Sequence, residues 1–159
     1  NGTYYEFSKQ VGGTHYVFLM LDNGYLATGA TDAPREHMAH EQLYWLHQRV
    51  AAHNDAVLIL AMHIPIGTDV TSEAIRSAVA DAPNIALVLA GHNHRDQIDD
   101  LDLGASHVVQ VRTASLGLGA QNWRRIRLLP DHIEVYKTGH QDQLERAIPI
   151  VARVSKPAA

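Results

Sequence analysis

Three histidines follow two apolar segments, at positions where imidazole groups suit metal binding. His92 and His94 are two residues apart, directly after the apolar segment 85–90 (IALVLA) and a glycine that allows a sharp turn. His63 closes a second apolar segment, 56–62 (AVLILAM). Both segments are short and rich in branched aliphatic residues, which is typical of buried β-strands. Since imidazole is a common ligand of transition metals, we predict that His63, His92 and His94 are metal ligands.

The segments around these histidines predict an α/β domain. Strands are expected at 4–8, 15–22, 57–62, 85–90 and 107–111, a hairpin at 123–129 and 132–138, helices at 36–52 and 71–80, and a loop at 25–35. The order strand, helix, strand, helix, strand predicts parallel pairing with helical crossovers. Ligands of such sheets bind beyond the carboxyl ends of the strands. We therefore expect Asp22, His63 and His92 on one rim of the sheet.

Length and composition limit the class of protein. The 159 residues correspond to one domain, and the absence of cysteine leaves imidazole, carboxylate and amide groups for any metal site. The net charge of −4, with histidine counted as neutral, provides no basic surface for non-specific binding of nucleic acid. No apolar run approaches the ~20 residues of a membrane helix. We expect a soluble domain, and the sequence leaves its compartment open.

Several polar residues have simpler interpretations than a binding site. The acidic cluster within residues 96–102 does not have the spacing of a calcium-binding loop, so we predict a solvated loop. Asp22 precedes Asn23 and Gly24, a combination that favours a turn over a metal ligand. Thr71 or Ser72 is the expected cap of the second helix. For His63, the alternative to a ligand is a neutral buried histidine bonded to the backbone.

Four segments, in this order, resemble the C-terminal half of calcineurin-like metallophosphoesterases. The first, 17–24 (VFLMLDNG), resembles a strand ending in Leu-Asp, and the second, 41–46 (EQLYWL), resembles a helix with Gln-Leu-x-Trp-Leu. The third, 62–65 (MHIP), resembles the His-x-Pro segment, and the fourth, 91–94 (GHNH), resembles the closing G-H-x-H motif. The resemblance covers residues 15–94, and the later strands fit the family's second sheet more loosely. It implies a layered αββα fold, with its C-terminal half at 1–138 and a partly frayed extension at 139–159.

This resemblance implies hydrolysis of a phosphoester, by a phosphatase or a phosphodiesterase that uses two divalent ions of manganese, iron or zinc. His63 and His92 would bind one ion and His94 the other. The family's first half carries D-x-H, Gly-Asp and G-N-H segments, and this sequence has none of them. Three histidines cannot hold two ions near 4 Å apart without a carboxylate between them. The resemblance therefore implies that the bridging carboxylate and the general acid lie upstream of Asn1, and it leaves the substrate open.

Three functions remain as hypotheses. The first is a metal-dependent phosphoester hydrolase in which this chain supplies the second-half ligands and is inactive alone. The second is a non-catalytic half-domain that binds or assembles with another chain, and the third is a single zinc site built from the three histidines. The expected partner is a missing N-terminal half or a second copy of the chain, associated through an open sheet edge. The strands at 17–21, 57–62 and 85–90 hold most of the aliphatic surface that such association would bury.

Overall fold

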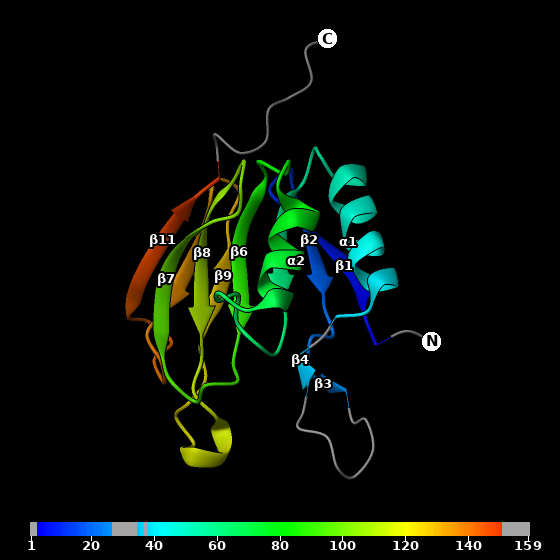
Figure 1. Cartoon of the computed structure of the whole chain (residues 1–159). Coiled ribbons are helices and arrows are strands. Elements are labelled where there is room, and N and C mark those ends of the chain that lie inside the picture. The colour runs from blue at the N-terminus through cyan, green and yellow to red at the C-terminus, as the bar shows by residue number, and fades with distance from the viewer. Residues whose placement is uncertain (1–2, 27–34, 37, 151–159) are drawn as a thin grey trace.

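The structure, a computed structural model, describes residues 3–26, 35–36 and 38–150. A large sheet forms its centre, with the strand order β1-β2-β5-β6-β8-β7 (Figure 1). These strands are β1 (Tyr5–Val11), β2 (Thr14–Met20), β5 (Val57–Ala61), β6 (Ile85–Ala90), β7 (Gln97–Asp102) and β8 (His107–Arg112). β2, β5, β6 and β8 run parallel, and β1 and β7 are antiparallel strands at the two edges. The predicted α/β class and parallel core are confirmed.

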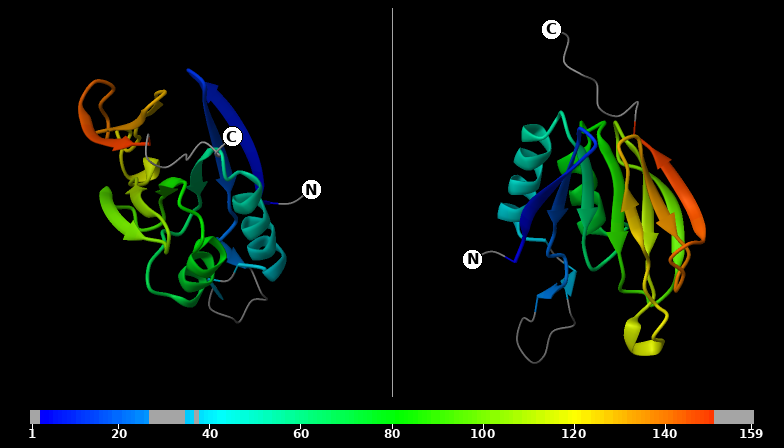
Figure 2. Two further views of the ribbon diagram at one scale, coloured as in Figure 1. Left: turned by 90° about the horizontal axis from the view of Figure 1, so that it is seen from above. Right: turned by 180° about the vertical axis from the view of Figure 1, so that it is seen from behind.

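The large sheet is covered on both faces. Helices α1 (His40–Ala52) and α2 (Val70–Val79) lie on one face, and a small sheet lies against part of the other (Figure 2). The small sheet has the order β11-β10-β9, with β9 (Ile126–Leu128), β10 (His132–Tyr136) and β11 (Leu144–Pro149). Along β5, Leu58 and Leu60 pack toward the helices, whereas Val57 and Ile59 pack toward the small sheet. Burial on both faces explains why the central strands are continuous apolar runs.

The segment before α1 differs from the prediction. A two-residue ladder between β3 (Tyr25–Leu26) and β4 (Arg35–Glu36) occupies the ends of the region predicted as a loop. Because residues 35–36 are extended, the helix cannot begin at residue 36 and begins at His40 instead. Residues 27–34 and 37 lie outside the described residues.

The cap of α2 also differs from the prediction. Asp69, rather than Thr71 or Ser72, is the N-cap, and its carboxylate accepts a hydrogen bond of 2.9 Å from the Ser72 N–H. An aspartate at this position satisfies one of the donors that a helix start leaves unpaired, so the helix begins one residue earlier, at Val70.

Besides β3 and β4, the sequence analysis missed the two longer strands β7 and β11. The acidic segment predicted as a solvated loop is the edge strand β7, which is antiparallel to β8. Its charges are paired, as in the ion pairs Asp99–Arg112 and Asp100–Arg146. Charged residues are common on edge strands, where they prevent further pairing, and here they concealed the strand pattern. β11 lies within the predicted extension 139–159 and pairs with β10, so the boundary predicted at 138 separates two paired strands.

The three strands that hold most of the aliphatic surface do not lie at an edge of the large sheet. β2, β5 and β6 are interior strands, because β1 pairs with β2 along its whole length and β8 pairs with β6. The edges of the large sheet are β1 and β7. A short 3₁₀ helix, η1 (Leu116–Leu118), lies between β8 and β9. Within the described ranges, no helix has the length and apolar character needed to cross a membrane.

Candidate metal centre

The carboxyl ends of β5 and β6 bring His63 and His92 together. The two strands are parallel neighbours, and the Gly91 N–H donates a 3.0 Å hydrogen bond to the His63 carbonyl just beyond them. His92 Nδ1 lies 3.3 Å from His63 Nε2, and the two rings are nearly perpendicular, at 82°. The shared rim predicted for these two histidines is therefore present in the structure.

The G-H-x-H turn is held in an uncommon backbone conformation. His92 and His94 have positive φ angles of 66° and 53°. Left-handed conformations in residues other than glycine cost on the order of 1–3 kcal/mol and cluster at functional sites. Asn93 N–H donates a 2.8 Å hydrogen bond to the Gly91 carbonyl, which closes the turn. The strain marks residues 91–94 as a segment whose geometry the fold enforces.

The histidine pair has the spacing expected of two ligands on one metal ion. With metal–nitrogen distances of about 2.1 Å, two imidazole nitrogens are about 3.0 Å apart at 90° and about 3.4 Å apart at the tetrahedral angle. The observed 3.3 Å lies within this range. Among the described residues, however, no group of three or more His, Cys, Asp or Glu side chains could hold a metal ion. His94 is exposed and does not complete a three-ligand cluster, so its role as a ligand stays a prediction.

A buried amide holds the His63 segment in place. Asn23 is only 2% exposed, and its Oδ1 accepts hydrogen bonds from the backbone N–H groups of His63 (3.1 Å) and Ile64 (3.0 Å). Its Nδ2 donates to the Ile64 carbonyl at 2.7 Å. One side chain from the end of β2 thus satisfies three backbone groups just beyond the end of β5. Asn23 therefore positions the backbone of His63 through hydrogen bonds.

Two further buried amides repeat this arrangement. The Gln42 side chain in α1 accepts from the Asp22 N–H (2.7 Å) and donates to the Asp22 carbonyl (2.8 Å). The Gln110 side chain in β8 makes the same pair of bonds with Ile66, at 2.7 and 3.2 Å. The Asp22 carboxylate lies 3.4 Å from the Gly24 N–H, which agrees with the turn role predicted for it. Together these amides fix the loops that follow β2 and β5.

The sequence analysis did not identify Asn23, Gln42 or Gln110 as functional residues. For Gln42 a signal was present, because it lies four and eight residues before Leu46 and Val50, and all three are buried on one face of α1. Gln110 interrupts the apolar run of β8. Asn23 lies in a segment with the composition of a simple turn. Its role depends on the position of β5, which only the structure shows.

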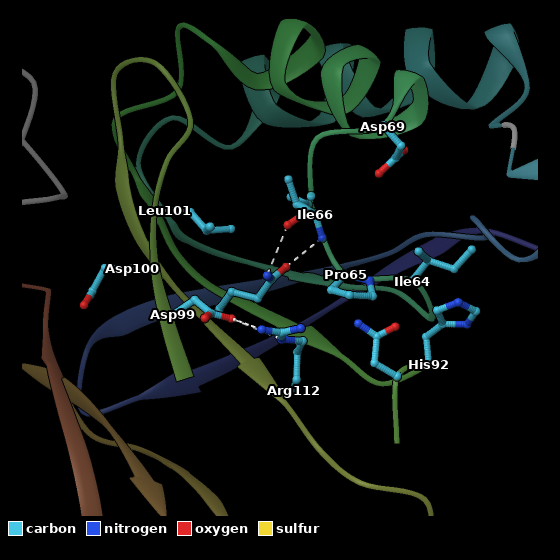
Figure 3. A pocket seen from close by; sticks show the side chains of 12 residues that line it. Ile64, Pro65, Ile66, Asp69, His92, Asp99, Asp100, Leu101 and Arg112 are labelled. Carbon is cyan, nitrogen blue, oxygen red and sulfur yellow. Dashed lines mark hydrogen bonds and ion pairs between the residues drawn. The ribbon is translucent and has the colours of Figure 1, made fainter. Parts of the chain in front are cut away.

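A pocket of about 490 Å³ begins beside His92 (Figure 3). One wall is the loop from Ile64 to Gly67, and the opposite side is formed by β7 and β8. The ion pair between Asp99 and Arg112 lines it, with both side chains mostly buried. The candidate metal centre therefore borders a cavity with charged and apolar walls.

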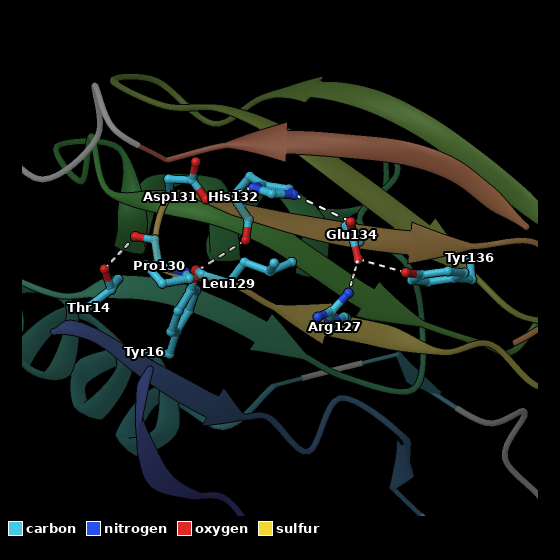
Figure 4. Close-up of polar contacts among 9 residues, drawn as sticks. All are labelled: Thr14, Tyr16, Arg127, Leu129, Pro130, Asp131, His132, Glu134 and Tyr136. Atoms are coloured by element: carbon cyan, nitrogen blue, oxygen red, sulfur yellow. Dashed lines mark hydrogen bonds and ion pairs between the residues drawn. The ribbon is translucent and has the colours of Figure 1, made fainter. Parts of the chain in front are cut away.

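A second polar cluster joins the two sheets around Tyr16 and His132 (Figure 4). The Tyr16 hydroxyl donates a 2.6 Å hydrogen bond to the Leu129 carbonyl, and burial, followed by the charge of Asp131, raises the pKa of Tyr16 to about 12. His132 Nδ1 lies 2.7 Å from the Asp131 carboxylate, and this hydrogen bond, supported by Glu134, raises the pKa of His132 above its usual value. The cluster connects Tyr16 of β2 with the turn between β9 and β10.

Comparison with known proteins supports the fold. No family model and no curated protein matches the sequence significantly. A dimetal phosphatase from Danio rerio superimposes with a TM-score of 0.66 and 13% identity, over 92% of this chain and 60% of that structure. Two further structures each match 92% of this chain. A putative 5'-nucleotidase from Staphylococcus aureus is 14% identical and is matched over 29% of its own length. The sulfate thiohydrolase SoxB from Thermus thermophilus is 16% identical and is matched over 25% of its own length. Their TM-scores of 0.46 are too low to support an argument.

The chain therefore has the fold of a dimetal phosphatase over the part of that fold it spans, which is 60% of the length of the Danio rerio structure. At this level of identity the likeness concerns the fold. It agrees with the layered metallophosphoesterase-like architecture predicted from the sequence motifs.

Proposed function

We propose that this chain supplies the histidine ligands of a metal-dependent phosphoester hydrolase, either a phosphatase or a phosphodiesterase. His63 and His92 would bind one divalent ion, and His94 a second one, with manganese, iron or zinc as the candidates. The observation that carries the proposal is the 3.3 Å separation of the two imidazole nitrogens at adjacent strand ends. When bound, the ions would polarise the phosphoryl group and activate water.

The residues of this chain have separate roles in the proposal. His63 and His92 bind through neutral imidazole nitrogens. Asn23 fixes the backbone of His63, and the hydrogen bond from Gly91 fixes that segment against the turn that carries His92. A site whose ligands are held before the ion arrives loses less entropy on binding.

The proposal includes a companion segment that supplies carboxylates. Among the described residues no carboxylate joins the histidine pair in a three-ligand group, and hydrolysis needs charged ligands that bridge two ions. The chain spans 60% of the Danio rerio phosphatase, so about two fifths of that structure has no counterpart here. We expect the companion to resemble that unmatched part, with an apolar face and at least one carboxylate.

An exposed apolar strip on β1 is where this companion would pack. Tyr5 and Phe7 of β1 are 54% and 42% exposed, and Phe7 stacks on Phe18 with ring centroids 4.5 Å apart. Phe7 and Phe18 are directly opposed in the ladder and therefore share the face that the small sheet covers elsewhere. A groove of about 370 Å³ along the ends of β2, β5 and β6 continues this strip to His63.

Zinc binding by the 159-residue chain tests the metal proposal. Isothermal titration calorimetry should show an affinity for Zn²⁺ that falls at least tenfold in His63→Ala or His92→Ala, because each variant removes one of two ligands. His140→Ala is the matched control, since His140 is exposed and remote from the motifs. Equal zinc affinity in all four proteins would contradict the proposal.

A second function, assembly without catalysis, is favoured by the exposed Tyr5–Phe7 strip. In that case the chain would associate with another chain through this strip and bind no zinc at the histidines. Sedimentation velocity on the wild type and on Phe7→Ser separates the two functions. Association that depends on Phe7, together with zinc binding that is unaffected by His92→Ala, would support assembly over hydrolysis.

A further inference from the structure

The pocket beside His92 has a polar floor on the helix side of the large sheet. Gln110 of β8 and Asp99 of β7 are directly opposed in the ladder, so they share a face. Val108, two residues before Gln110, packs with the core under the helices, which identifies that face. The pocket lies over β7 and β8, and its lining includes Asp69 at the N-terminus of α2.

The ion pair in this floor is held in a fixed geometry. Arg112 Nε and Nη2 both donate to Asp99 Oδ2, at 3.1 and 2.8 Å, and the two side chains are only 15% and 22% exposed. Partial burial of two charges costs desolvation energy, so such a pair is weak evidence for a purely stabilising role. In a pocket it offers directed donors and acceptors to a ligand at little further cost in entropy.

The walls of the pocket determine which ligand chemistry fits. Pro65 and Leu101 supply apolar surface, and in the view of Figure 3 Pro65 lies between the ion pair and His92. Asp69, Asp99 and Asp100 provide carboxylate acceptors, whereas Arg112 provides a cationic donor. An anionic group would face three carboxylates, but hydroxyl groups can donate to them and accept from the guanidinium. The volume of about 490 Å³ lies in the usual range for small-molecule sites.

We infer that this pocket binds the leaving group of a phosphomonoester, and that this group is uncharged and bears several hydroxyls, as a sugar does. The inference rests on the proposed function, because it places the phosphate of the same substrate at His63 and His92. Arg112 and Asp99 are then the residues that determine specificity, and they hydrogen-bond to the hydroxyls.

Titrations of the ¹⁵N-labelled full chain, followed by NMR, test this inference. Glucose 6-phosphate should shift the amides of Ile66, Leu101 and Gln110, with a Kd at least tenfold lower than those of 3-phosphoglycerate and inorganic phosphate. 3-Phosphoglycerate serves as the comparison because its leaving group carries a carboxylate. Equal affinity for the three compounds, or shifts confined to other regions, would overturn the inference.

Variants of the ion pair provide the second arm. Arg112→Met should weaken binding of glucose 6-phosphate at least tenfold. Arg127→Met is the matched control, because Arg127 also pairs with a carboxylate across two strands, Glu134, but far from the pocket. If Arg112→Met does not fold, the double variant Arg112→Met with Asp99→Leu removes both partners of the pair, leaves neither charge unpaired, and should show the same loss. Unchanged binding in a folded variant would refute the role of the pair.

Titration with Mn²⁺ separates this inference from the proposed function. Paramagnetic broadening at His63 and His92 without selectivity for glucose 6-phosphate would retain the metal proposal and reject the sugar pocket. Selectivity for glucose 6-phosphate without broadening would retain a hydroxyl-binding pocket and reject phosphoester hydrolysis as its purpose. Both signals together support the whole substrate assignment.

Discussion

Removal of the Asn23 side chain should loosen the His63 segment and destabilise the fold. In Asn23→Ala, the N–H groups of His63 and Ile64 and the carbonyl of Ile64 lose their hydrogen-bond partners. Because Asn23 is 2% exposed and Ile64 is 7% exposed, water cannot fully replace the lost bonds at Ile64.

The magnitude follows from these three bonds. A buried polar group left unpaired costs about 1–3 kcal/mol, and His63 is exposed enough for water to compensate in part. The free energy of unfolding should therefore fall by roughly 3–5 kcal/mol, a large share of the ~5–15 kcal/mol typical of a domain. For a chain of 159 residues this corresponds to a decrease in Tm of roughly 6–20 °C.

Urea denaturation and calorimetry on Asn23→Ala measure this change, and zinc titration measures its effect on the site. Asn54→Ala is the matched control, because Asn54 is exposed, and it should stay within about 0.5 kcal/mol of the wild type. Asn23→Asp keeps the acceptor but directs a carboxylate oxygen at the Ile64 carbonyl, so it should also destabilise. A free energy of unfolding for Asn23→Ala within about 0.5 kcal/mol of the wild type would refute the positioning role.

Three further results are expected. Tyr16→Phe removes the hydrogen bond to Leu129 and should lower the free energy of unfolding by about 1–2 kcal/mol in urea denaturation, whereas no change would show that the hydroxyl contributes nothing. The hydrogen bond to Asp131 raises the pKa of His132 in the folded protein above 6.5, so protonated His132 stabilises the fold fully at lower pH. This stabilisation is lost as the pH rises through the folded pKa. The urea midpoint of the wild type should therefore fall above about pH 6.5, and that of His132→Gln should fall less. The isolated chain should hydrolyse bis-p-nitrophenyl phosphate with manganese poorly or not at all, and rapid turnover abolished by His92→Ala would show that it needs no companion.

The central strands and the meeting of His63 with His92 could be predicted from sequence, because buried parallel strands are continuous apolar runs. Their carboxyl ends share one rim whatever the details of packing. β7 could not be recognised, since two of its three aspartates pair with arginines that lie 13 and 46 residues away along the chain. A prediction from local pattern has no access to such pairing.

The positioning residues were harder to predict for a related reason. Beyond the last ladder bond of a parallel strand, backbone groups lose their strand partners and must be satisfied in another way. Here Asn23, Gln42 and Gln110 act in place of a neighbouring strand, and each binds both donor and acceptor groups of the backbone. Their side chains can do so only when the folded sheet brings them to the loop. The imidazoles are therefore specified by a local motif, whereas the loop that carries His63 is fixed by amides that lie 40 and 44 residues from the backbone groups they bind.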